Sequence, residues 1–67
     1  MNERIRRLRR RARRWLGRCV EIENFSDREF KGVITRAGTN SLTVRTRRGR
    51  FRIFYRNIAE MKRDDDC

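Results

Sequence analysis

The chain has 67 residues, with 20 lysines and arginines against 9 aspartates and glutamates, and its formal net charge is +11. This length gives one small domain with a marginal core, for which oligomerisation is the expected supplement. The sequence contains no histidine, and its serines lie in turns without a neighbouring base, so it predicts neither an enzyme nor a cofactor. A charge of this size attracts polyanions, and nucleic acid is the first partner to consider.

Arginine supplies nearly all of the positive charge. Eighteen of the 20 basic residues are arginine, because Lys31 and Lys62 are the two lysines. The planar guanidinium group binds phosphate through two donors and can also stack on a nucleobase. The composition therefore favours nucleic-acid binding, and the alternative is a solvated cationic surface without a ligand.

Residues 2–16 are predicted to form an amphipathic helix. Asn2 is the expected N-cap, Glu3 lies in the first turn, and Gly17 provides the C-terminal stop. At helical spacing the apolar residues collect in one narrow stripe, which consists of Ile5, Leu8, Ala12, Trp15 and Leu16. This stripe predicts a helix with one buried face.

Arginines occupy the rest of the helix circumference. The segment carries eight arginines and one glutamate, which is +7 of the total charge of +11. The arginines near its C-terminal end are candidates for RNA contact: Arg10, Arg11, Arg13 and Arg14. A helix lying on a membrane surface is the competing interpretation, since tryptophan and leucine oppose the arginines. The narrow apolar stripe and the strands that follow favour packing on a core instead.

Residues 18–25 and 29–37 are predicted to form two strands joined by a turn at 26–28. Val20 and Ile22 alternate with polar residues in the first strand, and Phe30 and Ile34 point inward in the second. Gly32 lies in mid-strand, where a sheet bends sharply or a neighbouring chain segment comes close. A small, strongly bent barrel is therefore expected.

Three further strands are predicted at residues 41–46, 50–56 and 57–61. The turn between the first two carries a group of candidate phosphate contacts, Arg47, Arg48 and Arg50, for which a solvated turn is the alternative. Phe54 projects opposite to the inward-facing side chains of its strand, which are Phe51, Ile53 and Tyr55. Phe54 is therefore predicted to be either an interface residue or a platform on which a base stacks.

The predicted fold class is mainly β, with an N-terminal α-helix followed by a small, five-stranded, strongly bent antiparallel barrel. One domain spans residues 1–63, with the helix at about 2–16 and the barrel at about 18–62, and residues 64–67 form a disordered acidic tail. Cys19 and Cys67 suggest neither a disulfide nor a metal site, so a reducing, cytoplasmic location is expected. The sequence has no apolar run long enough to span a membrane.

The order of short motifs along residues 4–62 is similar to that of a known family. A helix and a glycine precede Val-x-Ile, a turn, Phe-x-Gly-x-Ile, a loop, a strand and a final Tyr-Arg-Asn-Ile segment. This order resembles the Sm-like family, most of all its bacterial Hfq branch, and Tyr55-Arg56-Asn57 stands where Hfq proteins show Tyr-Lys-His. The resemblance implies an Sm-like or SH3-like barrel and a homo-oligomeric ring, commonly a hexamer. In such a ring the fourth strand of one subunit pairs with the fifth strand of the next.

The resemblance also implies an RNA chaperone or post-transcriptional regulator that binds single-stranded RNA on ring faces. Arg56 and Asn57 would line a pore-side pocket for uridine-rich RNA, Tyr55 would lie near the subunit junction, and the helix arginines resemble a basic rim. Asn40 stands where the family has a base-stacking aromatic residue, so this pocket lacks its stacking ring. Glu23 replaces the aromatic residue of the adenine-reading face, and reading of adenine tracts is therefore not expected.

Other interpretations remain open. Gly-Arg-x-Val-x-Ile, Phe-x-Gly, Ser-Leu-Thr-Val and Asn-Ile-Ala-Glu resemble the C-terminal barrel of the ribosome maturation factor RimP, which implies a monomer that contacts the ribosome or ribosomal RNA. A protein-interaction adaptor would capture one protein partner even after nuclease treatment. A DNA-binding regulator would prefer duplex DNA and form no ring.

Overall fold

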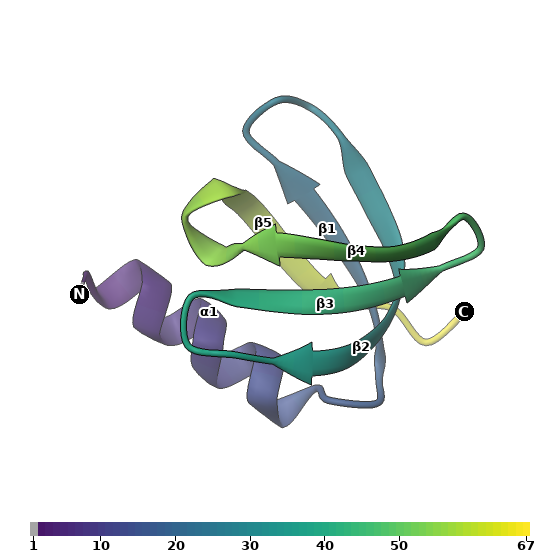
Figure 1. The fold of residues 1–67 in the computed structure, drawn as a ribbon, viewed down its shortest axis with the longest axis horizontal. Helices are drawn as coiled ribbons and strands as arrows, with labels where there is room; N and C mark the ends of the chain where they lie inside the picture. Colours follow the sequence, from purple (N-terminus) through teal and green to yellow (C-terminus); the bar gives the residue numbers. More distant parts are fainter. Residues whose placement is uncertain (1) are drawn as a thin grey trace.

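The structure, a computed structural model, describes residues 2–67 and is mainly β. One helix precedes a five-stranded antiparallel sheet with the strand order β4-β3-β2-β1-β5 (Figure 1). The elements follow the chain as α1 (Glu3–Arg14), β1 (Cys19–Asn24), β2 (Glu29–Ala37), β3 (Ser41–Thr46), β4 (Gly49–Phe54), the short 3-10 helix η1 (Tyr55–Asn57) and β5 (Ile58–Arg63). This arrangement confirms the predicted fold class, a bent barrel that the β4 and β5 edges leave open.

The helix α1 begins where the sequence predicts and ends earlier. The Asn2 side chain accepts a hydrogen bond of 2.9 Å from the Ile5 N–H, which confirms the N-cap. The helix ends at Arg14, and a turn leads to Gly17, whose φ of +82° suits glycine. Leu16 lies in this turn and is 53% exposed, so it does not continue the buried stripe. Within residues 2–67 no helix is both long enough and apolar enough to cross a membrane.

The sheet bends sharply at Gly32. This residue is buried, and a Cβ atom built on it would collide with the backbone carbonyl of Arg45 on the neighbouring strand β3. The register between β2 and β3 shifts between Ile34 and Arg36, and that between β1 and β5 shifts between Glu23 and Asn24. Bends and bulges of this kind curl a short sheet around its own core.

The core lies between α1 and the inner face of the sheet. Leu8 and Ala12 of α1 are buried against it. The buried strand residues confirm the predicted alternation, and they include Val20, Ile22, Ile34, Leu42, Val44 and Ile53. Phe30 and Phe51 are half-buried and pack at the border of the core. Tyr55 is buried as predicted, although it begins η1 instead of continuing the strand.

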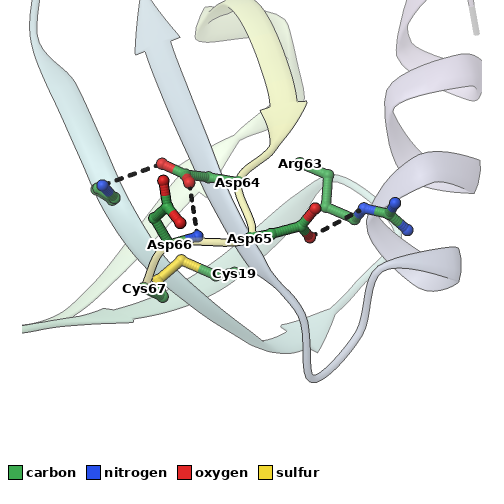
Figure 2. The surroundings of a disulfide bond; sticks show 7 residues. Cys19, Arg63, Asp64, Asp65, Asp66 and Cys67 are labelled. Atoms are coloured by element: carbon green, nitrogen blue, oxygen red, sulfur yellow. Dashed lines mark hydrogen bonds and ion pairs between the residues drawn. A yellow bond between two sulfur atoms is a disulfide. The ribbon is translucent and has the colours of Figure 1, made fainter.

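The C-terminal tail differs from the sequence expectation. Residues 64–67 are predicted to be disordered and the two cysteines to be unpaired, yet Cys67 forms a disulfide with Cys19 (Figure 2). The Asp64 N–H donates a 2.9 Å hydrogen bond to the Cys19 carbonyl, and the Asp64 carboxylate lies 3.1 Å from the Lys31 ammonium. Because β5 runs antiparallel beside β1, the chain that leaves β5 returns past the start of β1, where Cys19 lies. The expectation of no disulfide is therefore wrong.

Candidate nucleic-acid interface

The structure distributes the predicted site residues over two ends of the sheet. Asn40 and Tyr55 lie together, because the Tyr55 N–H donates a 3.0 Å hydrogen bond to the Asn40 carbonyl, and α1 contacts the adjoining η1. Arg47 and Arg48 occupy the β3–β4 turn at the opposite end of β3. Six strand residues separate the two ends by roughly 20 Å. The predicted residues therefore do not form one pocket within a single chain.

Tyr55 supports the end of the sheet at Asn40 from inside the core. Its ring is fully buried, and its hydroxyl donates a 2.8 Å hydrogen bond to the Gly38 carbonyl. Burial raises the pKa of the Tyr55 hydroxyl, and the positive charges of Arg13 and Arg9 partly oppose this rise. Tyr55 therefore positions the loop at Asn40 and does not face solvent.

Replacing Tyr55 with phenylalanine is expected to lower the free energy of unfolding by about 1–2 kcal/mol, because the Gly38 carbonyl loses its partner inside the protein. Urea unfolding followed by circular dichroism measures the difference. An unchanged midpoint would mean that water replaces the hydroxyl without cost.

A strip of arginines and one aromatic ring covers the outer face of β3, β4 and η1. We call it the β4 strip and define it as Arg45, Arg50, Arg52, Phe54 and Arg56. The guanidinium carbons of Arg52 and Arg56 lie 5.1 Å and 5.2 Å from the centre of the Phe54 ring. Arg45 and Arg50 stand directly opposite each other in the register of β3 and β4. Two like charges in this position repel each other, and an anion between them would relieve the repulsion.

The charge of the β4 strip is not neutralised by the protein. The acidic side chains that form ion pairs pair elsewhere, as Glu3 does with Arg7 and Asp65 with Arg63. In the part of the chain that the structure describes, none of the four arginines of the β4 strip forms an ion pair with a carboxylate. An unneutralised row of guanidinium groups beside an aromatic ring can bind phosphates and stack a base.

A second basic and aromatic surface is concave. We call it the hairpin groove, a cavity of about 710 Å³ beside the β3–β4 turn, lined among others by Arg28, Phe30, Arg47, Arg48, Phe51 and Asp66. The Phe30 and Phe51 rings lie 5.3 Å apart at an interplanar angle of 53°, and the Arg28 guanidinium lies 5.3 Å from the Phe30 ring centre. The groove thus combines two aromatic rings with guanidinium groups.

The remaining predicted residues lie on the surface around these two sites. Arg56 and Asn57 are exposed in η1, and the Asn57 carbonyl accepts a 3.1 Å hydrogen bond from the Phe25 N–H. Arg10 lines a shallow hollow of about 380 Å³ on α1. The other predicted arginines are exposed: Arg11, Arg13 and Arg14 on α1, and Arg50 on β4.

The sequence does not predict four basic or aromatic residues of these two surfaces as site residues: Arg45 in the β4 strip, and Arg28, Phe30 and Phe51 in the hairpin groove. Phe25 lies outside both surfaces; it is 67% exposed, and the Arg4 guanidinium lies 5.0 Å from its ring centre. An arginine two residues from a phenylalanine is the signal that finds Arg28 and Phe30, in Arg28-Glu-Phe30, and the same pattern recurs in Arg52-Ile-Phe54.

Across residues 2–67 no group of three or more Cys, Asp or Glu side chains could hold a metal ion. Comparison of the chain with protein-family models, with curated proteins and with solved structures finds no match. The arrangement of charge and aromatic rings on this chain is therefore the basis for a proposed function.

Proposed function

We propose that this protein binds single-stranded RNA through the β4 strip and acts without catalysis, as an RNA chaperone or post-transcriptional regulator. The observation that carries the proposal is the unneutralised row of arginines on β3, β4 and η1, in which Arg52 and Arg56 flank Phe54. Phosphates would bind the guanidinium groups, and an unstacked base would pack against the ring or against a guanidinium plane.

Single-stranded RNA fits this strip better than a duplex does. The bases of a duplex are stacked on one another, so an aromatic ring on the outer face of a sheet cannot reach their faces. The strip also lacks a protruding helix or ribbon that would enter a major groove. Preference for duplex DNA is therefore the outcome that the binding experiment must exclude.

The resemblance to Sm-like proteins extends this proposal to a homo-oligomeric ring, with a hexamer as the expected size. The strand order supports such pairing, because β4 and β5 are the two edges of the sheet. Their free backbone groups offer hydrogen bonds to the opposite edge of another copy. In a ring, Arg56 and Asn57 of successive copies would be repeated around a central opening.

The proposal is tested with Arg52→Ala/Arg56→Ala and a labelled 12-nucleotide oligouridylate RNA. Each phosphate contact adds about 0.7 to the slope of log affinity against log salt, so losing two contacts should lower the slope by about 1.4. The matched control is Arg18→Ala/Lys62→Ala, which removes two exposed charges from the β1 and β5 side of the sheet and should keep the slope.

Two outcomes would contradict the proposal. If Arg52→Ala/Arg56→Ala and the wild type have the same salt slope, the β4 strip is not the RNA-binding site. Tighter binding of a duplex DNA of the same length would remove the preference for single-stranded RNA. Measurement of the mass in solution tests the ring separately, since a strictly monomeric protein forms none.

A further inference from the structure

We propose that the hairpin groove is a second site for a nucleotide of single-stranded RNA, and that the acidic tail held by the Cys19–Cys67 disulfide restricts it. Reduction of the disulfide would release the tail and open the groove. This inference rests on the proposed function, because it concerns the same RNA at a separate place on the chain.

The groove has the size and chemistry for one nucleotide. Its volume of about 710 Å³ lies within the range of small-molecule sites in proteins. The tilted pair of rings, Phe30 and Phe51, offers apolar faces at the edge of the core. Arg47 and Arg48 lie at the β3–β4 turn and line the same groove, where their guanidinium groups can bind the phosphate of a nucleotide whose base packs against the rings.

The tail brings negative charge to this groove. Asp66 and Cys67 are part of its lining, together with the turn arginines Arg47 and Arg48. Asp65 pairs with Arg63 at 3.5 Å, and the Asp66 N–H donates a 2.9 Å hydrogen bond to the Asp64 carboxylate. The protein thus holds Asp66 at the wall of the groove, with Asp65 next to it in the chain, and these negative charges would repel an RNA phosphate bound there.

The disulfide and two contacts of Asp64 hold the tail in place, and they differ in strength. The covalent attachment is the disulfide, shown with the surrounding aspartates in Figure 2. Asp64 adds the hydrogen bond from its N–H to the Cys19 carbonyl and an ion pair with Lys31, in which the Asp66 N–H and the Lys31 ammonium lower the pKa of the Asp64 carboxyl. This pair lies on the surface, where ion pairs contribute little. Without the disulfide, the last residues would leave the groove for most of the time.

The switching reaction is an ordinary thiol–disulfide exchange with a small cellular thiol as reductant. The thiolate attacks the sulfur of Cys67, which is exposed, and forms a mixed disulfide while Cys19 leaves as a thiolate that takes up a proton. A second thiol molecule then releases Cys67 as a thiol. Two reductant thiols become one disulfide, and the protein gains two electrons and two protons.

The test measures affinity for the labelled 12-nucleotide oligouridylate RNA in the oxidised and reduced protein. We expect reduction to tighten binding at least threefold. Asp65→Asn/Asp66→Asn keeps the disulfide and both attachments made by Asp64, and in the oxidised state it should bind as tightly as the reduced wild type. The matched control Glu3→Gln/Glu60→Gln removes two exposed negative charges from α1 and β5 and should bind RNA less tightly than the tail variant.

Groove variants separate this inference from the proposed function. In Arg47→Ala/Arg48→Ala, affinity should no longer depend on reduction, while the salt slope due to the β4 strip persists. Equal affinity of oxidised wild type and oxidised Asp65→Asn/Asp66→Asn overturns the inference, even if reduction also weakens the fold. If no form binds the RNA, the proposed function itself fails. If RNA affinity depends on the β4 strip but is the same with and without the charges of Asp65 and Asp66, only the second site is ruled out.

Discussion

Replacing Cys67 with serine is expected to lower the free energy of unfolding by about 4 kcal/mol under oxidising conditions. The disulfide joins residues that are 48 positions apart, so it closes most of the barrel sequence into one loop. Closing a loop of this length restricts the unfolded chain strongly, and a domain of 67 residues has a small core to compensate for its loss. Guanidinium unfolding of the oxidised proteins measures the difference.

The same experiment in a reductant provides the control. Wild type and Cys67→Ser should then unfold at nearly the same denaturant concentration, because neither contains the bond. Cys19→Ser should behave like Cys67→Ser in the oxidised state. If wild type and Cys67→Ser unfold together without reductant, the two cysteines are not joined in solution.

Replacing Gly32 with alanine is expected to lower the free energy of unfolding by about 3 kcal/mol, at the upper end of the usual cost of overpacking. A Cβ atom at this position meets the carbonyl oxygen and carbon of Arg45, which are backbone atoms and cannot rotate away. Strands β2 and β3 must separate to make room, and the bend between them opens. Thermal unfolding followed by circular dichroism detects the loss.

Arg36→Ala is the control for this prediction. Arg36 is exposed on the same strand, so its truncation should change stability by about 0.5 kcal/mol or less. A Gly32→Ala protein as stable as Arg36→Ala would show that β2 and β3 are not in close contact at Gly32. The position also lines the hairpin groove, so this variant is unsuitable for tests of RNA binding.

Gly32 and the Cys19–Cys67 disulfide both shape the hairpin groove. The bend at Gly32 brings β3 close to β2, and the disulfide fixes the tail at the other side. In the proposed mechanism, the stability of the fold and the access of RNA to the groove are therefore linked. Reduction would cost stability and would expose the aromatic rings, and binding of RNA to the folded state would recover part of that stability.

The sequence by itself determined the elements of the fold, because their signals are local. The Asn2 side chain caps α1 by accepting a hydrogen bond from a backbone N–H three residues later, and the alternation around Ile22 or Val44 decides which face of a strand is buried. The excess of arginine is likewise a property of composition. Alternation alone predicts that Phe54 projects away from the core, and in the structure the guanidinium groups of Arg52 and Arg56 lie close to its ring.

Only the tertiary structure shows which residues from distant parts of the sequence lie next to each other. The tail reaches Cys19 because β5 pairs with β1 across almost the whole length of the chain, and no spacing in the sequence reveals such a partner. The pairing of β3 with its two neighbours β2 and β4 places Phe30 against Phe51. Contacts between residues far apart in the sequence depend on the register and bend of the whole sheet, and local patterns contain neither.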